Sequence, residues 1–347
     1  MKAVVYRGHG GPGVLSVEER EVPRPGAGEV LVKVEVSGVN PTDWKARAVG
    51  TFGSPEAERG QVPHQDGSGT VVAVGDGVPG ERVGERVWVW EAAWQRADGT
   101  AQEYVALPAR QAVALPDGAS FELGASLGIP ALTAHRCLTV ADGGPEQLAR
   151  DALAGRSVLV AGGAGVVGNA AIQLARWAGA TVVTTVSGPE KAALARAAGA
   201  HHIVNYREQD AASAIREAVP GGVDLIVEVA PAANAELIHA VAAPNASIAY
   251  YADAGGDAME LPVHKVMFNN LRWQGVLVYL IPEAAKAHAV AGVAAALADR
   301  ALRVGEEAGL PLHRFPLEKT ADAHAAVQDN VIGKVLVGVV GGEAGSV

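Results

Sequence analysis

The order of apolar and polar residues divides the chain into a first part rich in strands and a later part in which strands and helices alternate. Before about residue 122, short apolar runs such as Glu29–Ser37, Gly69–Val74 and Arg86–Val89 are separated by Gly and Pro, and helix signals are few. The run EVLVKVEVS at Glu29–Ser37 alternates, which predicts a strand with one solvated face. Many short strands with turn signals are typical of a β-barrel or a sandwich.

Near Phe121 the pattern changes to Ala-rich helical stretches between β-branched runs. We expect strands at Ser157–Ala161, Thr181–Val186, Val223–Ala230 and Ala246–Ala252, and helices at about 166–178, 190–198, 208–219 and 233–242. Alternation at this spacing predicts βαβ units and a parallel sheet. The last 70 residues hold an Ala-rich helix at about 282–299 and a final strand at Lys334–Val340.

The clearest functional motif is a glycine-rich turn between the first of these strands and its helix. It has the spacing GxGxxG and comprises Gly163, Ala164, Gly165, Val166, Val167 and Gly168. Such glycines allow a tight turn, a close approach of a pyrophosphate to backbone N–H groups, and close packing of helix on strand. The helix N-terminus also favours an anion. The flanking strand and helix make this turn a predicted dinucleotide site.

The residues after the second strand indicate which dinucleotide is bound. Proteins that bind NAD place an acid there to contact the ribose 2′-hydroxyl, whereas this chain continues with Ser187 and Gly188. Lys191 follows on the first turn of the next helix, and Tyr206 closes a short third strand. A hydroxyl, an ammonium and a phenol suit a 2′-phosphate. We therefore expect NADPH as the cofactor.

Composition and charge restrict the other classes of partner. The net charge of −10, from 38 acids against 28 bases, argues against nucleic acid as the main partner. One cysteine, Cys137, excludes a disulfide framework and a cysteine-based zinc cluster. The longest apolar stretch, Ala289–Ala298, is half the length of a bilayer span, and from the short apolar run at the N-terminus we expect no signal peptide. We expect a soluble cytoplasmic protein without membrane or nucleic-acid partners.

With these motifs identified, the chain resembles the zinc-independent quinone oxidoreductases, the zeta-crystallin-like branch of the medium-chain dehydrogenase/reductases. The resemblance covers nearly the whole length. Besides the glycine turn, it is carried by these segments: Gly38–Asp43 (GVNPTD), Asp66–Gly69 with Val74 and Gly75, Gly128–Ala134 (GIPALTA) and Asn205–Glu208 (NYRE).

The resemblance implies an α/β fold of two domains. A GroES-like β-barrel domain is formed by residues 1–122 and 279–347, and a Rossmann domain with a doubly wound parallel sheet is formed by residues 123–278. The resemblance also implies a homodimer or a tetramer. In the family the sixth strand, here around Trp273–Tyr279, lies at the edge of the Rossmann sheet, and because it is apolar and uncharged we expect a homodimer paired through it. Related zinc enzymes carry metal ligands where this chain has Asn40, Gln65–Asp66 and Ile129, so we expect no metal.

The same resemblance assigns further site residues. Asn40 and Lys45 are the expected catalytic residues beside the nicotinamide, with Lys45 as oxyanion partner or proton donor. Asp43 is expected to be a structural hydrogen-bond acceptor. Beyond the glycine turn and Ser187, Lys191 and Tyr206, the expected cofactor contacts are Thr133 at a helix start, Tyr251, Ala252 and Asp253 after the fifth strand, Leu277, Val278 and Tyr279 ending the sixth, and Lys334.

The activity implied is metal-free reduction of a quinone or an α,β-unsaturated ketone, a small-molecule substrate, by hydride transfer from NADPH. An enoyl reductase of a biosynthetic or carrier-bound intermediate is the alternative. The sequence does not separate the two, because the substrate pocket depends on loops such as Val49–Val62 and Glu91–Thr100. A protein that binds NADPH without catalysis, or that binds RNA, fits less well because the chain is acidic.

Overall fold

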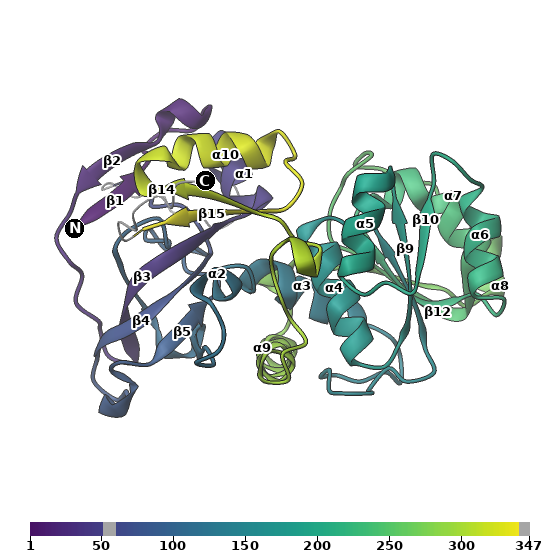
Figure 1. Cartoon of the computed structure of the whole chain (residues 1–347), viewed down its shortest axis with the longest axis horizontal. Helices are drawn as coiled ribbons and strands as arrows, with labels where there is room; N and C mark the ends of the chain where they lie inside the picture. The colour runs from purple at the N-terminus through teal and green to yellow at the C-terminus, as the bar shows by residue number, and fades with distance from the viewer. Residues whose placement is uncertain (51–59, 340–347) are drawn as a thin grey trace. The chain divides into compact units, whose positions relative to one another are not determined.

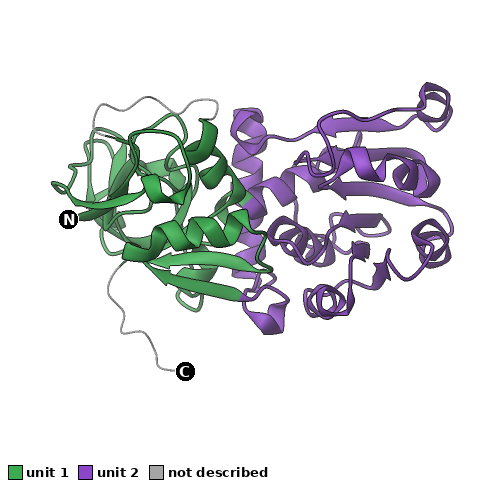
Figure 2. Cartoon of the chain, turned by 90° about the horizontal axis from the view of Figure 1, so that it is seen from above, with its two compact units in different colours: residues 1–129, 312–347 green, residues 130–311 purple. Residues whose placement is uncertain are grey.

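The structure, a computed structural model, describes residues 1–50 and 60–339 and divides into two compact units (Figure 2). Unit 1 comprises Met1–Ile129 and Leu312–Val347, and unit 2 comprises Pro130–Pro311. Most of the loop Val49–Val62, and Val340 at the end of the expected last strand, lie outside the described residues.

The resemblance implied that the chain returns to unit 1 at residue 279. In the structure it returns at Leu312. The residues after helix α9 (Glu283–Ala298) are bound to helix α4 (Val166–Trp177) of unit 2. Asn169 Nδ2 donates to the carbonyl oxygen of Ala308 at 2.8 Å, and Trp177 Nε1 donates to Asp299 Oδ2 at 2.8 Å. These bonds hold the segment to unit 2, and an Ala-rich pattern does not reveal them in the sequence.

Unit 1 is built on a twisted, largely antiparallel sheet. Seven strands occur in the order β14-β15-β3-β4-β5-β7, with β6 pairing β3 off this path, and β1 and β2 form a separate antiparallel pair. The strands are β1 (Lys2–Val5), β2 (Ser16–Glu19), β3 (Glu29–Val39), β4 (Asp66–Val74), β5 (Arg86–Val89), β6 (Tyr104–Pro108), β7 (Ala112–Ala114), β14 (Leu312–Pro316) and β15 (Lys334–Gly338).

Strand β3 shows how the sequence pattern positions the core of unit 1. Val30, Val32 and Val34 are buried, and Lys33 and Glu35 are partly exposed, as the alternation predicted. Leu31 and Ser37, which the same alternation would place on the face of Lys33, are also buried. The described part of unit 1 also contains the helices α1 (Pro41–Val49), α2 (Phe121–Gly124) and α10 (Thr320–Gln328). Figure 1 shows α10 lying over β14 and β15. Helix α3 (Gly128–Leu138) contains the boundary between the units.

Unit 2 contains a six-stranded parallel sheet in the order β10-β9-β8-β11-β12-β13. Figure 1 shows α4 and α5 on one side of this sheet and α6 and α7 on the other, as in a doubly wound fold. The elements are β8 (Ser157–Ala161), β9 (Thr181–Val186), α5 (Pro189–Ala197), β10 (His202–Asn205), α6 (Ala211–Ala218), β11 (Val223–Glu228), α7 (Pro231–Val241), β12 (Ala242–Tyr250), α8 (Val263–Phe268) and β13 (Arg272–Gly275).

The sixth strand is shorter than expected. β13 ends at Gly275, and the N–H of Val276 makes a last bond to the carbonyl of Tyr250 at 2.8 Å. Val278–Leu280 then form a 3₁₀ turn that buries Val278 and Tyr279. The expectation that Leu277, Val278 and Tyr279 end the strand was therefore wrong.

Within the described ranges, no helix is long and apolar enough to cross a bilayer.

Candidate functional site

The glycine-rich turn lies at the carboxyl end of β8 and leads directly into α4. Gly162 takes a left-handed backbone with φ of 68°, and the N–H of Gly165 closes the turn on the carbonyl of Gly162 at 2.9 Å. Gly165 is the N-cap of α4, and Val166, Val167 and Gly168 form the first turn. The N–H groups of a first helical turn have no partner within the helix. They therefore provide the donors that an anion needs.

Two glycines of the motif are required by close packing. A Cβ at Gly168 would lie 2.4 Å from the carbonyl oxygen of Gly162, and one at Gly163 would lie 2.1 Å from the Thr184 hydroxyl on β9. The absence of side chains therefore lets the helix start press against β8 and β9. Ala164 between them is buried, whereas Gly165 is exposed. This is the packing that a dinucleotide turn requires.

Two of the three expected 2′-phosphate ligands are adjacent at the carboxyl edge of the sheet. β9 and β10 pair in parallel up to Val186 and Asn205, and the N–H of Tyr206 donates to the carbonyl of Val186 at 3.2 Å. Tyr206 thus follows β10 at the level where Ser187 follows β9. The Tyr206 side chain is 51% exposed. Lys191 is partly exposed in the first turn of α5.

Glu228, at the end of β11, is a buried acid that the sequence reasoning missed. One of its carboxylate oxygens accepts bonds from Ala230 N–H at 2.6 Å and Asn234 Nδ2 at 2.9 Å. Burial raises the pKa of this carboxyl, while the two N–H donors oppose the rise. Tyr251, the residue after β12, donates its N–H to the Glu228 carbonyl at 3.1 Å. An acid near the end of the fourth predicted strand, Val223–Ala230, was a signal available in the sequence.

The remaining expected cofactor residues have mixed environments. Thr133 is buried in the middle of α3 and not at a helix start, because α3 begins at Gly128. Tyr251 and Ala252 are partly buried after β12, and Asp253 is exposed. Leu277 is 49% exposed, in contrast to buried Val278 and Tyr279.

In unit 1, Asn40 lies in a buried polar cluster. Its side-chain Nδ2 donates to Asp66 Oδ2 at 2.7 Å, and its Oδ1 accepts from Lys334 Nζ at 2.8 Å. Lys334 Nζ also donates to the Val39 carbonyl at 3.1 Å and lies 3.9 Å from Asp66 Oδ2. Lys334 is only 1% exposed. Its ammonium therefore contacts Asn40 and Asp66, and the side chain has almost no surface from which to make the expected contact with a cofactor.

Asp66 and Asp43 fix the backbone around this cluster. The second oxygen of Asp66 accepts the N–H of Ile129 at 2.9 Å, and a Cβ on Gly128 would lie 2.0 Å from that oxygen. The N–H of Asn40 donates to Asp43 Oδ2 at 2.7 Å. Burial raises the pKa of both carboxyls, and the Lys334 ammonium opposes the rise. Asp43 thus has the geometry of the structural acceptor that the sequence predicted.

Lys45 occupies the exposed side of the same helix. Asn40 is the N-cap of α1, Asp43 is buried in its first turn, and Lys45 lies two residues further on with its side chain exposed. The two lysines of unit 1 singled out by the sequence therefore differ in access. Lys45 can meet a molecule in solution, and Lys334 cannot.

The three positions that hold metal ligands in related zinc enzymes do come together. Asn40 and Ile129 both bind Asp66, and Gln65 Oε1 accepts the N–H of Ala93 at 3.1 Å. Across residues 1–50 and 60–339, no group of three His, Cys, Asp or Glu side chains could hold a metal ion. An amide, an already bonded carboxylate and an isoleucine are a poor donor set for zinc.

A buried chain of hydrogen bonds connects α1 to α10 and to the sheet. Arg47 Nε donates to His324 Nδ1 at 3.3 Å, and His324 Nε2 lies 2.9 Å from His64 Nε2. His64 Nδ1 lies 2.8 Å from the Ser37 hydroxyl on β3. Arg47, Ser37 and both histidines are buried completely.

The last hydrogen bond of this series, at Thr100, determines the position of every proton in the series. The Thr100 hydroxyl donates to the Asp66 carbonyl at 2.5 Å and so accepts from Ser37, 2.7 Å away. Ser37 has then used its proton, so His64 Nδ1 must carry one and donate it. Burial holds the pKa of His64 well below its usual value and that of His324 at about 3. Both rings are neutral, and His324 Nε2 donates to His64 Nε2.

Because this series of hydrogen bonds contains two neutral histidines, we expect the stability of the protein to depend on pH. Protonation of either ring would place two N–H donors face to face, so each folded-state pKa lies below the unfolded value near 6.5. The unfolded chain then binds more protons below pH 6.5, and the free energy of unfolding falls as the pH falls.

We expect His324→Gln to reduce that fall by about 2 kcal/mol between pH 7 and pH 5. Urea unfolding of both proteins at the two pH values measures the difference. Asp43 and Asp66 titrate in the opposite sense, but both proteins contain them, so their contribution cancels. Parallel stability profiles for parent and variant would contradict the assignment of a neutral His324.

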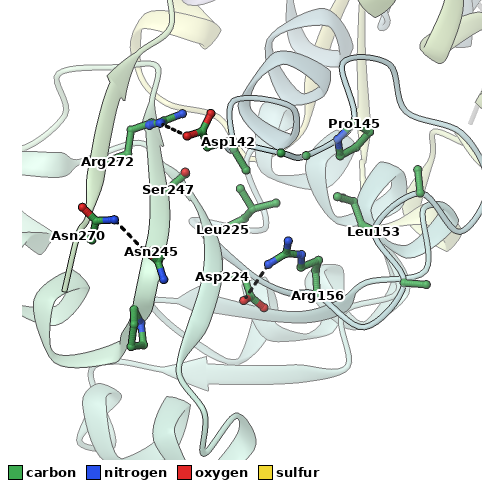
Figure 3. Close-up of a pocket in the computed structure, with 16 residues that line it drawn as sticks. Asp142, Pro145, Leu153, Arg156, Asp224, Leu225, Asn245, Ser247, Asn270 and Arg272 are labelled. Atoms are coloured by element: carbon green, nitrogen blue, oxygen red, sulfur yellow. Dashed lines mark hydrogen bonds and ion pairs between the residues drawn. The ribbon is translucent and has the colours of Figure 1, made fainter.

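A cavity of about 650 Å³ lies at the opposite, amino-terminal edge of the unit 2 sheet (Figure 3). Its charged side chains pair with one another: Arg272 with Asp142 at 2.8 Å, and Arg156 with Asp224 at 3.5 Å. Asn270 Nδ2 also donates to Asn245 Oδ1 at 2.8 Å across its wall. Ligands of open α/β sheets bind beyond the carboxyl ends of the strands, so this cavity is separate from the dinucleotide site.

Comparison with known proteins agrees with this arrangement. Residues 26–117 match the alcohol dehydrogenase GroES-like domain, and residues 166–294 match the family described as zinc-binding dehydrogenase. A quinone oxidoreductase of Rattus norvegicus is 36% identical over 231 residues, which cover 66% of each chain. A trans-enoyl reductase of Thermothelomyces thermophilus is 35% identical over 239 residues, covering 64% of this chain and 62% of the relative. The match thus spans about two thirds of each curated relative.

Solved structures match over nearly the whole chain. An NAD-dependent alcohol dehydrogenase superposes with a TM-score of 0.83 at 29% identity, covering 98% of this chain and 100% of the other. A mycobacterial protein solved with NADPH superposes with a TM-score of 0.77 at 29% identity, covering 97% and 99%. Both units of the fold are therefore shared with these proteins. The chain belongs to the quinone oxidoreductase (zeta-crystallin-like) family of the medium-chain dehydrogenase/reductases.

Proposed function

We propose that this protein is an NADPH-dependent reductase of quinones or α,β-unsaturated ketones that works without a metal ion. The observation that carries the proposal is the dinucleotide turn of unit 2, followed at the edge of the sheet by Tyr206 beside Ser187 with no acid between them. The solved relative that contains NADPH supports the choice of cofactor. The relative named as NAD-dependent makes that choice one to be tested.

The residues of unit 2 fit NADPH. The first turn of α4 would hold the pyrophosphate, and Ser187, Lys191 and Tyr206 would hold the 2′-phosphate. Glycines at 163 and 168 leave no side chain between the helix start and β8, as the close approach to Thr184 and Gly162 shows. When bound, NADPH supplies a hydride.

In unit 1, we assign the electrostatic role to Lys45. Negative charge grows on a carbonyl oxygen as a conjugated ketone is reduced, and a positioned cation stabilises that charge. Lys45 is an exposed residue and Lys334 is enclosed, so of these two lysines we assign the contact with a substrate to Lys45. Asn40 has one side-chain N–H left over after its bond to Asp66, which can bind a substrate or ribose oxygen.

One observation supports the alternative hypothesis of an enoyl reductase, namely the similarity to a trans-enoyl reductase. Both hypotheses use the same residues, so they differ only in the substrate. Steady-state assays with NADPH and a panel of quinones, simple enones and enoyl thioesters decide between them. If the protein turned over no member of the panel, both hypotheses would be refuted.

Activity should survive exhaustive treatment with a chelator, because the mechanism needs no metal. A loss of activity together with the loss of one zinc per chain would contradict the metal-free mechanism.

Lys191 provides the test of cofactor choice. Lys191→Ala removes one charge-assisted contact, worth about 1.5–3 kcal/mol. We expect the affinity for NADPH to fall about tenfold or more, while binding of NADH barely changes. Arg196→Ala is the matched control, because Arg196 is an exposed cation in the last turn of the same helix. Fluorescence titration with each cofactor measures both effects. Equal affinity of the parent for NADPH and NADH would refute the assignment.

We also propose that the protein forms a homodimer through the β13 edge of unit 2. No other strand in the described part of the chain pairs with the outer side of β13. The preceding helix α8 exposes Val263, Met267 and Phe268, which are 65–75% exposed. An uncovered strand edge beside apolar residues favours association, and pairing about a two-fold axis would cover this edge in both copies.

A cytoplasmic location stays a prediction of the sequence.

Substituting both Met267 and Phe268 by Glu should convert dimers into monomers. Dimerisation would then bury two carboxylates without partners, and the free energy needed to bury them exceeds the free energy gained from the interface. Light scattering at micromolar concentration measures the mass. Val83→Glu is the control, because Val83 is 50% exposed but belongs to unit 1. A monomeric parent would overturn the proposal.

A further inference from the structure

The buried ammonium of Lys334 occupies a cage of oxygen atoms. The cage consists of Asn40 Oδ1 at 2.8 Å, the Val39 carbonyl at 3.1 Å and Asp66 Oδ2 at 3.9 Å. Lys334 reaches it from β15, near the C-terminal end of the chain, while its partners belong to β3, β4 and the start of α1. Lys334 is 1% and Asp66 0% exposed, so solvent weakens this arrangement little.

We propose that Lys334 is a positioning residue that fixes the side-chain amide of Asn40 for the reaction. The inference rests on the proposed reductase function for its catalytic consequence. Lys334 itself touches no substrate, because it is enclosed. It acts by holding Asn40, itself only 3% exposed, whose second side-chain N–H remains after the bond to Asp66 and is the group that we assign to the ligand.

The chemistry of the two neighbours leaves Asn40 one orientation. An ammonium only donates, so it must face the amide oxygen, and a carboxylate accepts, so Asp66 must face the amide nitrogen. The distances of 2.8 Å and 2.7 Å are those of charge-assisted bonds. If either charge were removed, the amide could rotate by half a turn and present its oxygen where the N–H now lies.

A purely stabilising role explains this pair less well. Two buried charges lose their hydration, and a well-packed apolar pair of the same volume is often as stable or more so. What an apolar pair cannot do is set the direction of an amide. The cluster also holds the residues that begin α1, because the Asn40 N–H binds Asp43 and Val39 binds Lys334. The arrangement therefore favours geometry over stability as its purpose.

The first experiment removes the charges of Asp66 and Lys334 together, which leaves Asp43, bound by the Asn40 N–H, as the buried carboxyl of the cluster. In the double variant Asp66→Asn, Lys334→Met, we expect a melting temperature close to that of the parent and an NADPH dissociation constant within about twofold. We expect kcat with an enone to fall about tenfold to a hundredfold, the usual result of a misplaced group. A folded double variant with parental kcat and KM would overturn the proposal.

Chemical rescue separates the ammonium from the packing of its stem. Lys334→Ala removes the atoms of n-propylammonium, so adding this amine should refill the cage and restore kcat at least about tenfold. Lys334→Met fills the same space without charge and should not respond, and neither should the parent. Equal responses of both variants, or no response of Lys334→Ala, would count against the cage.

A readout without turnover keeps this inference independent of the proposed activity. In the parent, the side-chain amide of Asn40 should give a dispersed, slowly exchanging NMR signal, which the double variant loses. If the parent reduces no quinone or enone, the reductase proposal fails, and the NMR signal still decides whether Lys334 positions Asn40. An unchanged Asn40 signal in the double variant would refute the positioning role by itself.

Discussion

Gly165→Ala is expected to leave unit 2 folded and to weaken NADPH binding by about tenfold or more. Gly165 has φ of −77° and ψ of 162°, a conformation that alanine adopts without strain. Its new Cβ would lie 3.3 Å from the Gly162 carbonyl, which a small shift accommodates. The same methyl group would stand at the N-terminus of α4, where the second glycine of the motif lets a pyrophosphate approach the backbone.

Two other alanine variants show what the loss means. In Gly168→Ala the Cβ would meet the Gly162 carbonyl at 2.4 Å, so α4 must move away from β8, and both the melting temperature and NADPH binding should fall. Gly221→Ala is the neutral control, because nothing lies within 4 Å of the new Cβ. Thermal unfolding and fluorescence titration measure the three variants. A Gly165→Ala protein with parental affinity would mean that the turn does not hold the pyrophosphate.

The parts of the fold that the sequence predicted are those specified locally. β8 and β9 begin and end where the apolar runs begin and end, because both faces of a central parallel strand are buried. The glycine turn was recognisable for the same reason, since strand, turn and helix are consecutive in the chain. The helix α4 ends at Trp177, one residue before its expected end.

The polar networks of unit 1 could not be predicted, because they depend on residues far apart in the chain. Lys334 and Asn40 are separated by 294 positions, and Arg47 and His324 by 277. No periodicity or spacing reports such a contact. The sequence therefore predicted Lys334 as a cofactor contact and Asn40 as a catalytic residue, with no sign that the two side chains bind each other. The structure shows that most of both side chains is used internally.

The errors at the end of unit 2 have a similar cause. WQGVLVY has the composition of a strand, but composition does not show where the neighbouring strand stops. β12 ends at Tyr250, so β13 has no partner beyond Val276 and the chain turns. The exposed surfaces of α8 and β13, which carry the dimer proposal, become visible only when the sheet order is known.

The last expected result concerns Lys45, the exposed cation of α1. Its ammonium would meet the oxygen that gains charge during reduction, a contact stronger in the transition state than in the ground state. Loss of one such donor costs about 10²–10³ in turnover in other enzymes. Lys45→Ala should therefore lower kcat strongly with a simple enone and leave NADPH affinity nearly unchanged. A quinone forms a more stable reduced anion, so its loss should be smaller.

Lys45→Met separates charge from packing, because methionine keeps most of the stem and removes the ammonium. If electrostatics governs turnover, both variants should be slow with an enone, and their kcat values should agree. If the stem matters, only Lys45→Ala should be slow. Steady-state kinetics with one enone and one quinone, together with NADPH titration, measures all three quantities. Parental enone turnover in both variants would exclude Lys45 as the oxyanion partner and leave the free N–H of Asn40, held by Lys334 and Asp66, as the donor in unit 1.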